Sequence, residues 1–139
     1  MRREISAKFR IHTALFFLTL LGTVAAQDLP INGTFVGGDD AHEAAGSFEI
    51  AATEEGRVLN FSEDFSVRRG PDLFVWLVQG DDVENRATLE RLQSARGAQS
   101  YVIPNEVDLS SYDRVLVWCR AFGVLFATGE FGAAGQASP

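Results

Sequence analysis

Leu73-Phe74-Val75-Trp76-Leu77-Val78 is the stretch that decides the fold, because it is apolar at every position. A strand with apolar side chains on both faces is typical of the centre of a sheet. Around this stretch, glycines and pairs of turn residues recur at short intervals, which is the pattern of an all-β domain. We therefore expect residues 73–78 to form the central strand of a β-domain.

Further strands are expected on both sides of this central run. Polar and apolar residues alternate along 46–52, as they do in a half-buried strand. Glu54-Glu55-Gly56 then forms a turn, and 57–61 returns as the hairpin partner. The remaining expected strands are 33–37, 100–103 (ended by Pro104-Asn105), 115–121 and 124–127, with Gly123 as the kink or turn between the last two.

The number of strands favours a sandwich over other architectures. Residues 85–96 contain only Leu89 and Leu92 among charged residues, so this segment is either a short helix or an irregular strand. With about eight strands in roughly 100 residues, we predict a single antiparallel two-sheet β-sandwich. It spans about 30–131, and Phe74, Trp76, Val117 and Trp118 are expected in or near its core.

The N-terminal stretch resembles an export signal rather than a part of the fold. Arg2, Arg3, Lys8 and Arg10 precede an apolar run, and Val24-Ala25-Ala26 has the small residues expected before a cleavage site. The apolar run is about a dozen residues, and a membrane-spanning helix needs roughly 20. We predict a signal peptide over 1–26, an exported periplasmic or extracellular protein, and no stable membrane insertion after cleavage. The small, polar residues 132–139 are expected to be a disordered tail.

The charge of the mature chain excludes one class of partner. The whole chain has 12 basic and 19 acidic residues, of which four basic residues and one acid lie in 1–26. The mature chain therefore has 8 arginines and 18 acids, a net charge of −10. Such a surface repels nucleic acids and anionic lipid head groups. The acid pairs Asp39-Asp40 and Asp81-Asp82 each follow a glycine, and we expect solvated turns there rather than a calcium site.

Cys119 is the only cysteine of the chain. Exported proteins normally pair their cysteines, so a lone thiol indicates a ligand, a redox group, an intermolecular bridge or a small core residue. Alternation places Val115, Val117, Cys119 and Ala121 on one face of their strand, which favours the core residue. The sequence pattern alone leaves these alternatives open.

His42 is the only histidine outside the predicted signal, and it lies in a polar loop. One His and one Cys are too few for blue copper, for structural zinc or for a four-cysteine iron–sulfur cluster. Non-covalent haem with His42 or Cys119 as an axial ligand remains consistent with this inventory, and so does a solvent-exposed histidine. Since hydrolase and phosphate-binding motifs are absent, we do not expect the domain to be an enzyme by itself.

Four ordered motifs resemble those of the DM13 domain family. They are Gly70-Pro71-Asp72-Leu73-Phe74-Val75-Trp76-Leu77, Gly97-Ala98-Gln99-Ser100-Tyr101-Val102-Ile103-Pro104, Val107-Asp108-Leu109-Ser110-Ser111-Tyr112, and Val117-Trp118-Cys119-Arg120-Ala121-Phe122-Gly123-Val124-Leu125-Phe126-Ala127. Upstream, Gly33-Thr34-Phe35, His42 and Gly46 are similar to the opening pattern of that family. The resemblance covers about 29–131.

The resemblance implies an electron-transfer module that accompanies DOMON domains, which are β-sandwiches able to bind haem or sugars. It places Cys119 at the position of the family's signature cysteine, as a free redox thiol or a haem ligand, and His42 at the family's histidine position. We therefore expect a redox module with an unidentified redox or protein partner. The alternative is a non-catalytic extracytoplasmic binding sandwich in which Cys119 only packs. A shared site requires His42 and Cys119 to approach each other across the sandwich.

Overall fold

The structure, a computed structural model, describes residues 28–132. The predicted signal peptide over 1–26 lies outside the described residues, and so does the predicted tail over 132–139 except Gly132, whose N–H donates to the carbonyl of Asn32 at 2.6 Å. The described strands are β1 (Ile31–Thr34), β2 (Val36–Gly37), β3 (Ala44–Ala45), β4 (Ser47–Thr53), β5 (Gly56–Phe61), β6 (Ser66–Val67), β7 (Leu73–Gln79), β8 (Asp82–Arg91), β9 (Gln99–Ile103), β10 (Arg114–Cys119) and β11 (Val124–Glu130). One 3-10 turn, η1 (Leu109–Ser111), precedes β10.

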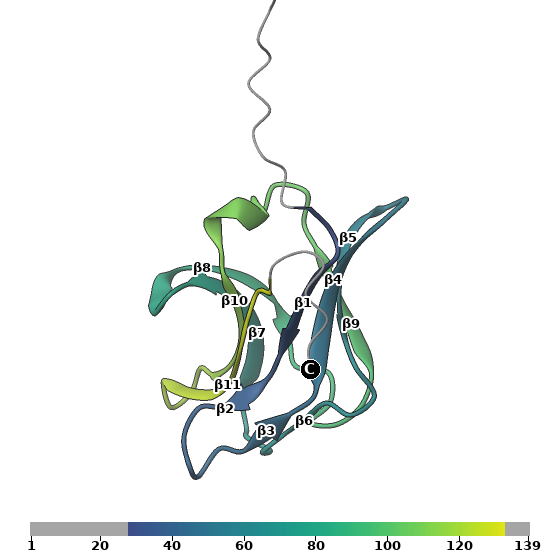
Figure 1. The fold of residues 1–139 in the computed structure, drawn as a ribbon. Coiled ribbons are helices and arrows are strands. Elements are labelled where there is room, and N and C mark those ends of the chain that lie inside the picture. Colours follow the sequence, from purple (N-terminus) through teal and green to yellow (C-terminus); the bar gives the residue numbers. More distant parts are fainter. Residues whose placement is uncertain (1–27, 133–139) are drawn as a thin grey trace, which may run out of the picture.

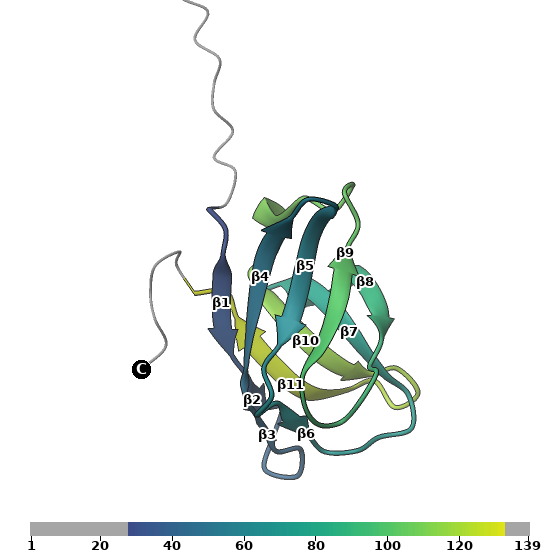
Figure 2. The same ribbon diagram turned by 90° about the vertical axis from the view of Figure 1, so that its right-hand side faces the viewer.

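These strands form two facing sheets, so the predicted β-sandwich is confirmed (Figures 1 and 2). One sheet has four strands in the order β1-β4-β5-β9, and the other has five in the order β2-β11-β10-β7-β8. β3 and β6 pair as a short ribbon at one end. The pairings between these strands are all antiparallel. β7 lies between β8 and β10, away from the sheet edge, as its apolar sequence predicted.

The chain changes sheet at Phe35, where a single strand over 33–37 was predicted. β1 pairs with β4 in the four-stranded sheet, whereas β2 pairs with β11 in the other sheet. Phe35 between them is buried, and its backbone N–H donates to the carbonyl of Gly46 at 2.8 Å. The prediction of one continuous strand was therefore wrong, because the buried phenylalanine bridges the two sheets.

Of the segment 85–96, which the sequence left undecided between helix and strand, residues 85–91 belong to β8 and the rest follows it as a loop. Thr88, Ala87 and Glu90 pair with residues of β7, and the register shifts twice along the pair. β8 occupies the edge of the five-stranded sheet, where such irregularity does not disturb a second neighbour. The segment is thus the irregular strand of the two alternatives.

A cluster of aromatic rings fills the space between the sheets. Phe35 contacts Phe48, Phe61 and Phe65 with ring centroids 5.3, 4.8 and 5.1 Å away, and Phe61 contacts Tyr101 at 5.2 Å. Offset or edge-on rings at such distances stabilise a core beyond the area that they bury. Val117 belongs to the same buried cluster, as predicted.

The two tryptophans lie in a second, separate apolar cluster. Trp76 and Leu116 form a second cluster, against which Phe74 and Trp118 are partly buried. Because side chains alternate along a strand, this cluster lies on the outer face of the five-stranded sheet, while Val75 and Val117 point to the inner face. Trp76 is buried and Trp118 is partly buried, as predicted for residues in or near a core, but their cluster lies on the outer face and not between the sheets.

The strand predicted over 115–121 ends at Cys119. Ala121 is exposed in the turn that follows, so it does not share the buried face of Val115, Val117 and Cys119. Gly123 in this turn has φ of +63°, a conformation that residues with a Cβ rarely adopt. Within residues 28–132 there is no helix long and apolar enough to cross a membrane.

Candidate functional site

Cys119 is the last residue of β10 and faces the interior between the sheets. Its cross-strand neighbours are Leu73 on β7 and Val124 on β11, and its side chain has no solvent exposure. Among the described residues the thiol makes no side-chain hydrogen bond, and it forms no disulfide. The surroundings are therefore apolar, as expected of a cysteine that packs as a small hydrophobic residue.

A β-bulge shapes the end of the sandwich next to Cys119. The register of β10 and β11 shifts so that Val117 faces Ala127 while Trp118 faces Leu125, which leaves Phe126 as the additional residue. The ring of Phe126 lies against Gly70, where an added Cβ would come within 2.9 Å of two ring carbons. Only glycine allows this close approach, so Gly70 and the bulge together position Phe126 over this end of the core.

His42 packs on the other side of Phe126. The centroids of the two rings are 4.3 Å apart, and the imidazole Nδ1 lies 2.7 Å from Oδ1 of Asp39. The same carboxylate oxygen accepts the backbone N–H groups of Ala41 and His42 at 2.8 and 2.9 Å. These bonds, led by the one from the His42 side chain, hold the pKa of Asp39 below its usual value. Asp39 therefore fixes the orientation of the imidazole.

His42 and Cys119 meet at the same end of the sandwich but do not bond to each other. Phe126, which contacts His42, is two residues along β11 from Val124, the cross-strand neighbour of Cys119. No hydrogen bond within residues 28–132 links the imidazole to the thiol, and Nδ1 is engaged by Asp39. The direct Cys–His hydrogen bond that a reactive shared site needs is therefore absent from the described residues.

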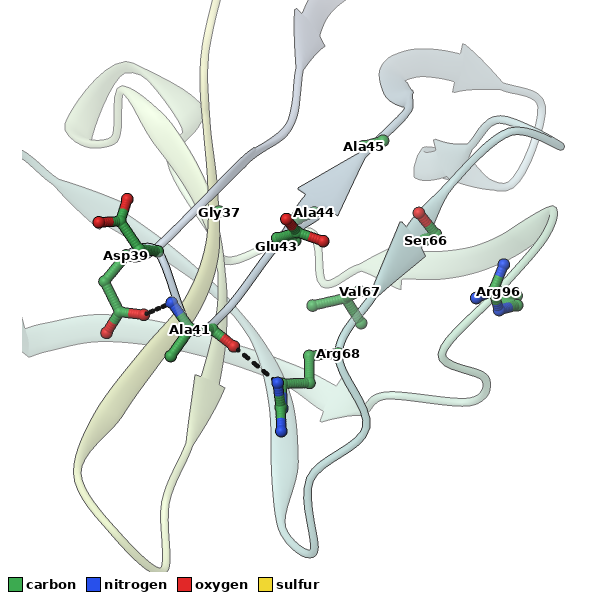
Figure 3. Close-up of a pocket in the computed structure, with 11 residues that line it drawn as sticks. Gly37, Asp39, Ala41, Glu43, Ala44, Ala45, Ser66, Val67, Arg68 and Arg96 are labelled. Atoms are coloured by element: carbon green, nitrogen blue, oxygen red, sulfur yellow. Dashed lines mark hydrogen bonds between the residues drawn. The ribbon is translucent and has the colours of Figure 1, made fainter.

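A wide groove is lined by Ala41 and Glu43, the chain neighbours of His42 (Figure 3). Its volume is about 1030 Å³, and its lining includes Asp39, Asp40, Glu43, Arg68 and Arg96. Arg68 donates from Nη1 to the carbonyl of Ala41 at 3.1 Å and so ties the loop to β6. The lining mixes both signs of charge, and in the described part of the chain no three His, Cys, Asp or Glu side chains are arranged to hold a metal ion.

The residues present do not fit a haem group. A haem is a large apolar ring, and Cys119 is enclosed by Leu73, Val124 and the rest of the core without an opening to solvent. The groove formed by the residues around His42 is wide enough, but its lining carries Asp39, Asp40, Glu43, Arg68 and Arg96, which does not suit an apolar ring. Haem ligation by Cys119 and His42 together would require this end of the sandwich to be rebuilt.

Sequence reasoning missed the two residues that define the surroundings of His42. Asp39 stands three positions before His42, and an Asp at this spacing commonly closes a turn by accepting backbone N–H groups, which was a readable signal. Phe126 gave no such signal, because its position depends on the bulge and on contact with Gly70, far away in sequence.

Comparison with known proteins identifies one family. Residues 34–131, well over half of the chain, match the sequence model of a family described as "Electron transfer DM13". Searches of curated proteins and of solved structures gave no significant match.

Proposed function

The chain belongs to the DM13 family, and on that premise we propose that it is an exported electron-transfer domain whose redox group is the thiol of Cys119. The observation that carries the proposal is the family match over 34–131, which includes Cys119 and is described as electron transfer. Cys119 is also the only thiol in the chain, so any thiol chemistry must use it.

A lone thiol transfers electrons most simply by exchange with a disulfide of a partner protein. The Cys119 thiolate attacks one sulfur of that disulfide, a new S–S bond forms, and the old S–S bond breaks with the other sulfur leaving as a thiolate. Disulfides are stable outside the cytoplasm, which agrees with the predicted signal over 1–26. Because Cys119 is fully buried, this exchange needs the end of the sandwich formed by Phe126 and His42 to open.

The test is the rate at which Cys119 reacts with an aromatic disulfide reagent under native conditions. We expect a slow reaction that is nevertheless faster than global unfolding, since only one end of the sandwich has to open. His42→Ala removes part of the cover and should accelerate it, and Cys119→Ser should abolish it. If the thiol reacts only at the rate of global unfolding, the redox proposal fails.

Export is tested separately by N-terminal sequencing of the protein recovered from outside the cytoplasm. The proposal requires a mature N-terminus at or near Gln27. An intact Met1 on the recovered protein would contradict cleavage, without bearing on the thiol chemistry.

The second candidate is a non-catalytic binding domain in which Cys119 only packs. The observation that favours it is the complete burial of a thiol that has no polar partner among the described residues. Purified protein would then be colourless before and after addition of haem, and its thiol would react only on unfolding.

A further inference from the structure

The two sheets of the sandwich differ sharply on their outer faces. The four-stranded sheet presents Glu49, Asn60 and Ser100 outward, as expected of a face in water. The five-stranded sheet instead carries Trp76, Leu116 and their neighbours on its outer face. In Figure 1 the four-stranded sheet lies on one side of β7 and β10, and no second sheet of the described residues lies on the other.

Three arginines lie directly over the aromatic rings of this outer face. The guanidinium carbon of Arg86 is 4.1 Å from the ring centroid of Trp76, and those of Arg91 and Arg120 are 4.9 and 4.4 Å from that of Phe74. Trp76 in turn stacks on Trp118 with centroids 5.3 Å apart. These six residues, Phe74, Trp76, Trp118, Arg86, Arg91 and Arg120, are called the arginine–aromatic face below.

Asp72 orders two of the three arginines. Its carboxylate oxygens lie 3.0 Å from Nη2 of Arg91 and 3.2 Å from Nε of Arg120, and its side chain is only 16% exposed. The side chains of Arg91 and Arg120 are 57% and 59% exposed, so most of their N–H donors face solvent. Prepositioned guanidinium groups of this kind are the preferred receptors of carboxylates.

The charge of this face is opposite to that of the whole chain. Residues 28–132 contain 18 acids and 8 arginines, yet the arginine–aromatic face and Asp72 together carry three positive charges against one negative. The groove of about 420 Å³ that adjoins Arg91 adds Arg69 and has no acidic side chain in its lining. A second folded copy would bring its whole acidic surface against this one and be repelled over most of the contact, whereas a short acidic segment can contact the arginines of this face alone.

Two buried polar atoms on the same face lack partners. Nε1 of Trp76 and Oγ1 of Thr128 make no hydrogen bond, and both residues pair with Leu116 in one row across the sheet. Buried donors without acceptors are uncommon. Both atoms are enclosed by the described residues, so they are a polar defect of this face and not a contact open to a partner.

We propose that the arginine–aromatic face binds an acidic polypeptide segment. Carboxylates of the segment bind Arg86, Arg91 and Arg120, and its apolar side chains cover the exposed parts of Phe74 and Trp118. Tryptophan, other aromatic residues and arginine are the types that dominate binding energy at protein interfaces. This inference does not depend on the redox role of Cys119, which points to the opposite face of the sheet.

Tryptophan fluorescence tests the proposal directly, because the only two tryptophans of the chain lie on this face. The probe is a peptide of glutamates and leucines without aromatic residues, and its counterpart has lysines in place of the glutamates. We expect a saturable change in fluorescence with the glutamate peptide, weakened by salt, and none with the lysine peptide. Arg86→Gln and Arg120→Gln should each weaken binding about fivefold, the size expected of a partly exposed charged contact.

Arg96→Gln is the matched control, since it removes the same charge from the exposed groove of Figure 3 and should leave binding unchanged. Circular dichroism of each variant verifies that it is folded. Absence of a saturable change, or equal binding by all variants, would overturn the proposal. So would light scattering that shows a dimer lost in Arg86→Gln and Arg120→Gln, because the occupant would then be a second copy.

Discussion

At the scale of single residues, Cys119 shows how little of a thiol's chemistry is available in a closed core. Its side chain has no exposure and no polar partner among the described residues, so its contribution to the native state is packing. The isosteric replacement by serine keeps the volume but places a hydroxyl where no acceptor is present. A buried hydroxyl without a hydrogen bond costs about 1–3 kcal/mol.

We therefore predict that Cys119→Ser destabilises the protein more than Cys119→Ala, although alanine leaves a small cavity. Alanine should cost about 1 kcal/mol, the loss of one small buried group. Urea unfolding of the wild type and the two variants, followed by tryptophan fluorescence, measures the difference. Equal stability of Cys119→Ser and the wild type would mean that the hydroxyl finds a partner and that the site is more polar than its surroundings indicate.

Tyr101 provides a pH-dependent contribution to stability. The residue is fully buried, its hydroxyl donates to Oε1 of Gln99 at 2.5 Å, and it accepts the backbone N–H of Gln93 at 3.0 Å. Burial, aided by the negative charge of Glu90 and partly offset by the bond from Gln93, raises the pKa of Tyr101 from 10.0 to about 12. The neutral phenol is therefore favoured in the folded protein.

Since this folded-state pKa lies above the unfolded one, the stabilisation is complete below pH 10 and is lost as the pH rises from 10 towards 12. We predict a loss of about 2 kcal/mol in the free energy of unfolding over that interval. Tyr101→Phe should be less stable at neutral pH, because Gln93 and Gln99 lose a partner, but its stability should fall less between pH 10 and 12. Residues 28–132 contain no lysine, so few other groups titrate there. Parallel curves for both proteins would refute the assignment to Tyr101.

At the scale of elements, the packing between β1 and β11, which belong to different sheets, depends on two glycines that contact the ring of Phe48. A Cβ on Gly33 of β1 would lie 2.3 Å from Cζ of Phe48, and one on Gly129 of β11 would lie 2.6 Å from Cε1 of the same ring. β1 and β11 belong to different sheets, so the ring of Phe48 fits between the strands that join them. Because Gly33 and Gly129 have no side chains, the ring of Phe48 can pack directly against the backbone of both strands.

We predict that Gly129→Ala destabilises the protein by about 1–3 kcal/mol through overpacking against Phe48. Phe48→Leu removes the ring atoms that clash, so the added cost of Gly129→Ala should be much smaller in that background. A double-mutant cycle measured by chemical unfolding gives the coupling directly. Strict additivity of the two changes would show that the backbone, rather than the Phe48 ring, sets the requirement for glycine.

Elements also show what the sequence could and could not predict. Alternation and turns located the β4–β5 hairpin, the central β7 and the β10–β11 pair, because these depend on local patterns. The change of sheet at Phe35 and the bulge at Phe126 depend on contacts between distant segments, which no single window contains. The apolar pattern of residues 73–78 correctly predicted a strand buried on both faces, but not that arginines lie over the aromatic rings of its outer face.

The contacts of the candidate site also join distant segments, so the sequence predicted them only in part. His42 and Cys119 were identified by counting residues of each type, and the structure brings them to the same end of the sandwich. That the His42 ring packs on Phe126, and that Asp39 engages Nδ1 of His42, follows only from the folded geometry. The arginine–aromatic face was invisible to sequence reasoning because Phe74, Arg86 and Arg120 come from three different strands or turns.

At the scale of the whole molecule, the excess of acidic over basic residues is the main electrostatic influence on stability. With 18 acids against 8 arginines, residues 28–132 carry a net charge of −10, and self-repulsion on this scale opposes the compact state. Ion pairs of the described residues are few and largely exposed, among them Arg114 with Asp113 and Glu130, so their screening by salt costs little. Salt screens the repulsion over distances of about 10 Å at 0.1 M.

We predict that the melting temperature of the mature protein rises when sodium chloride is added to a low-salt buffer at neutral pH, and that most of the rise occurs by about 0.1 M, where the Debye length falls to about 10 Å. Sodium and potassium chloride should act alike, because screening depends on ionic strength and not on a bound cation. Glu49→Gln and Glu63→Gln, at exposed acids without an ion pair in the described structure, should raise the melting temperature at low salt and reduce its dependence on salt. A melting temperature that falls with added salt would mean that attractive pairs outweigh the repulsion among the acids.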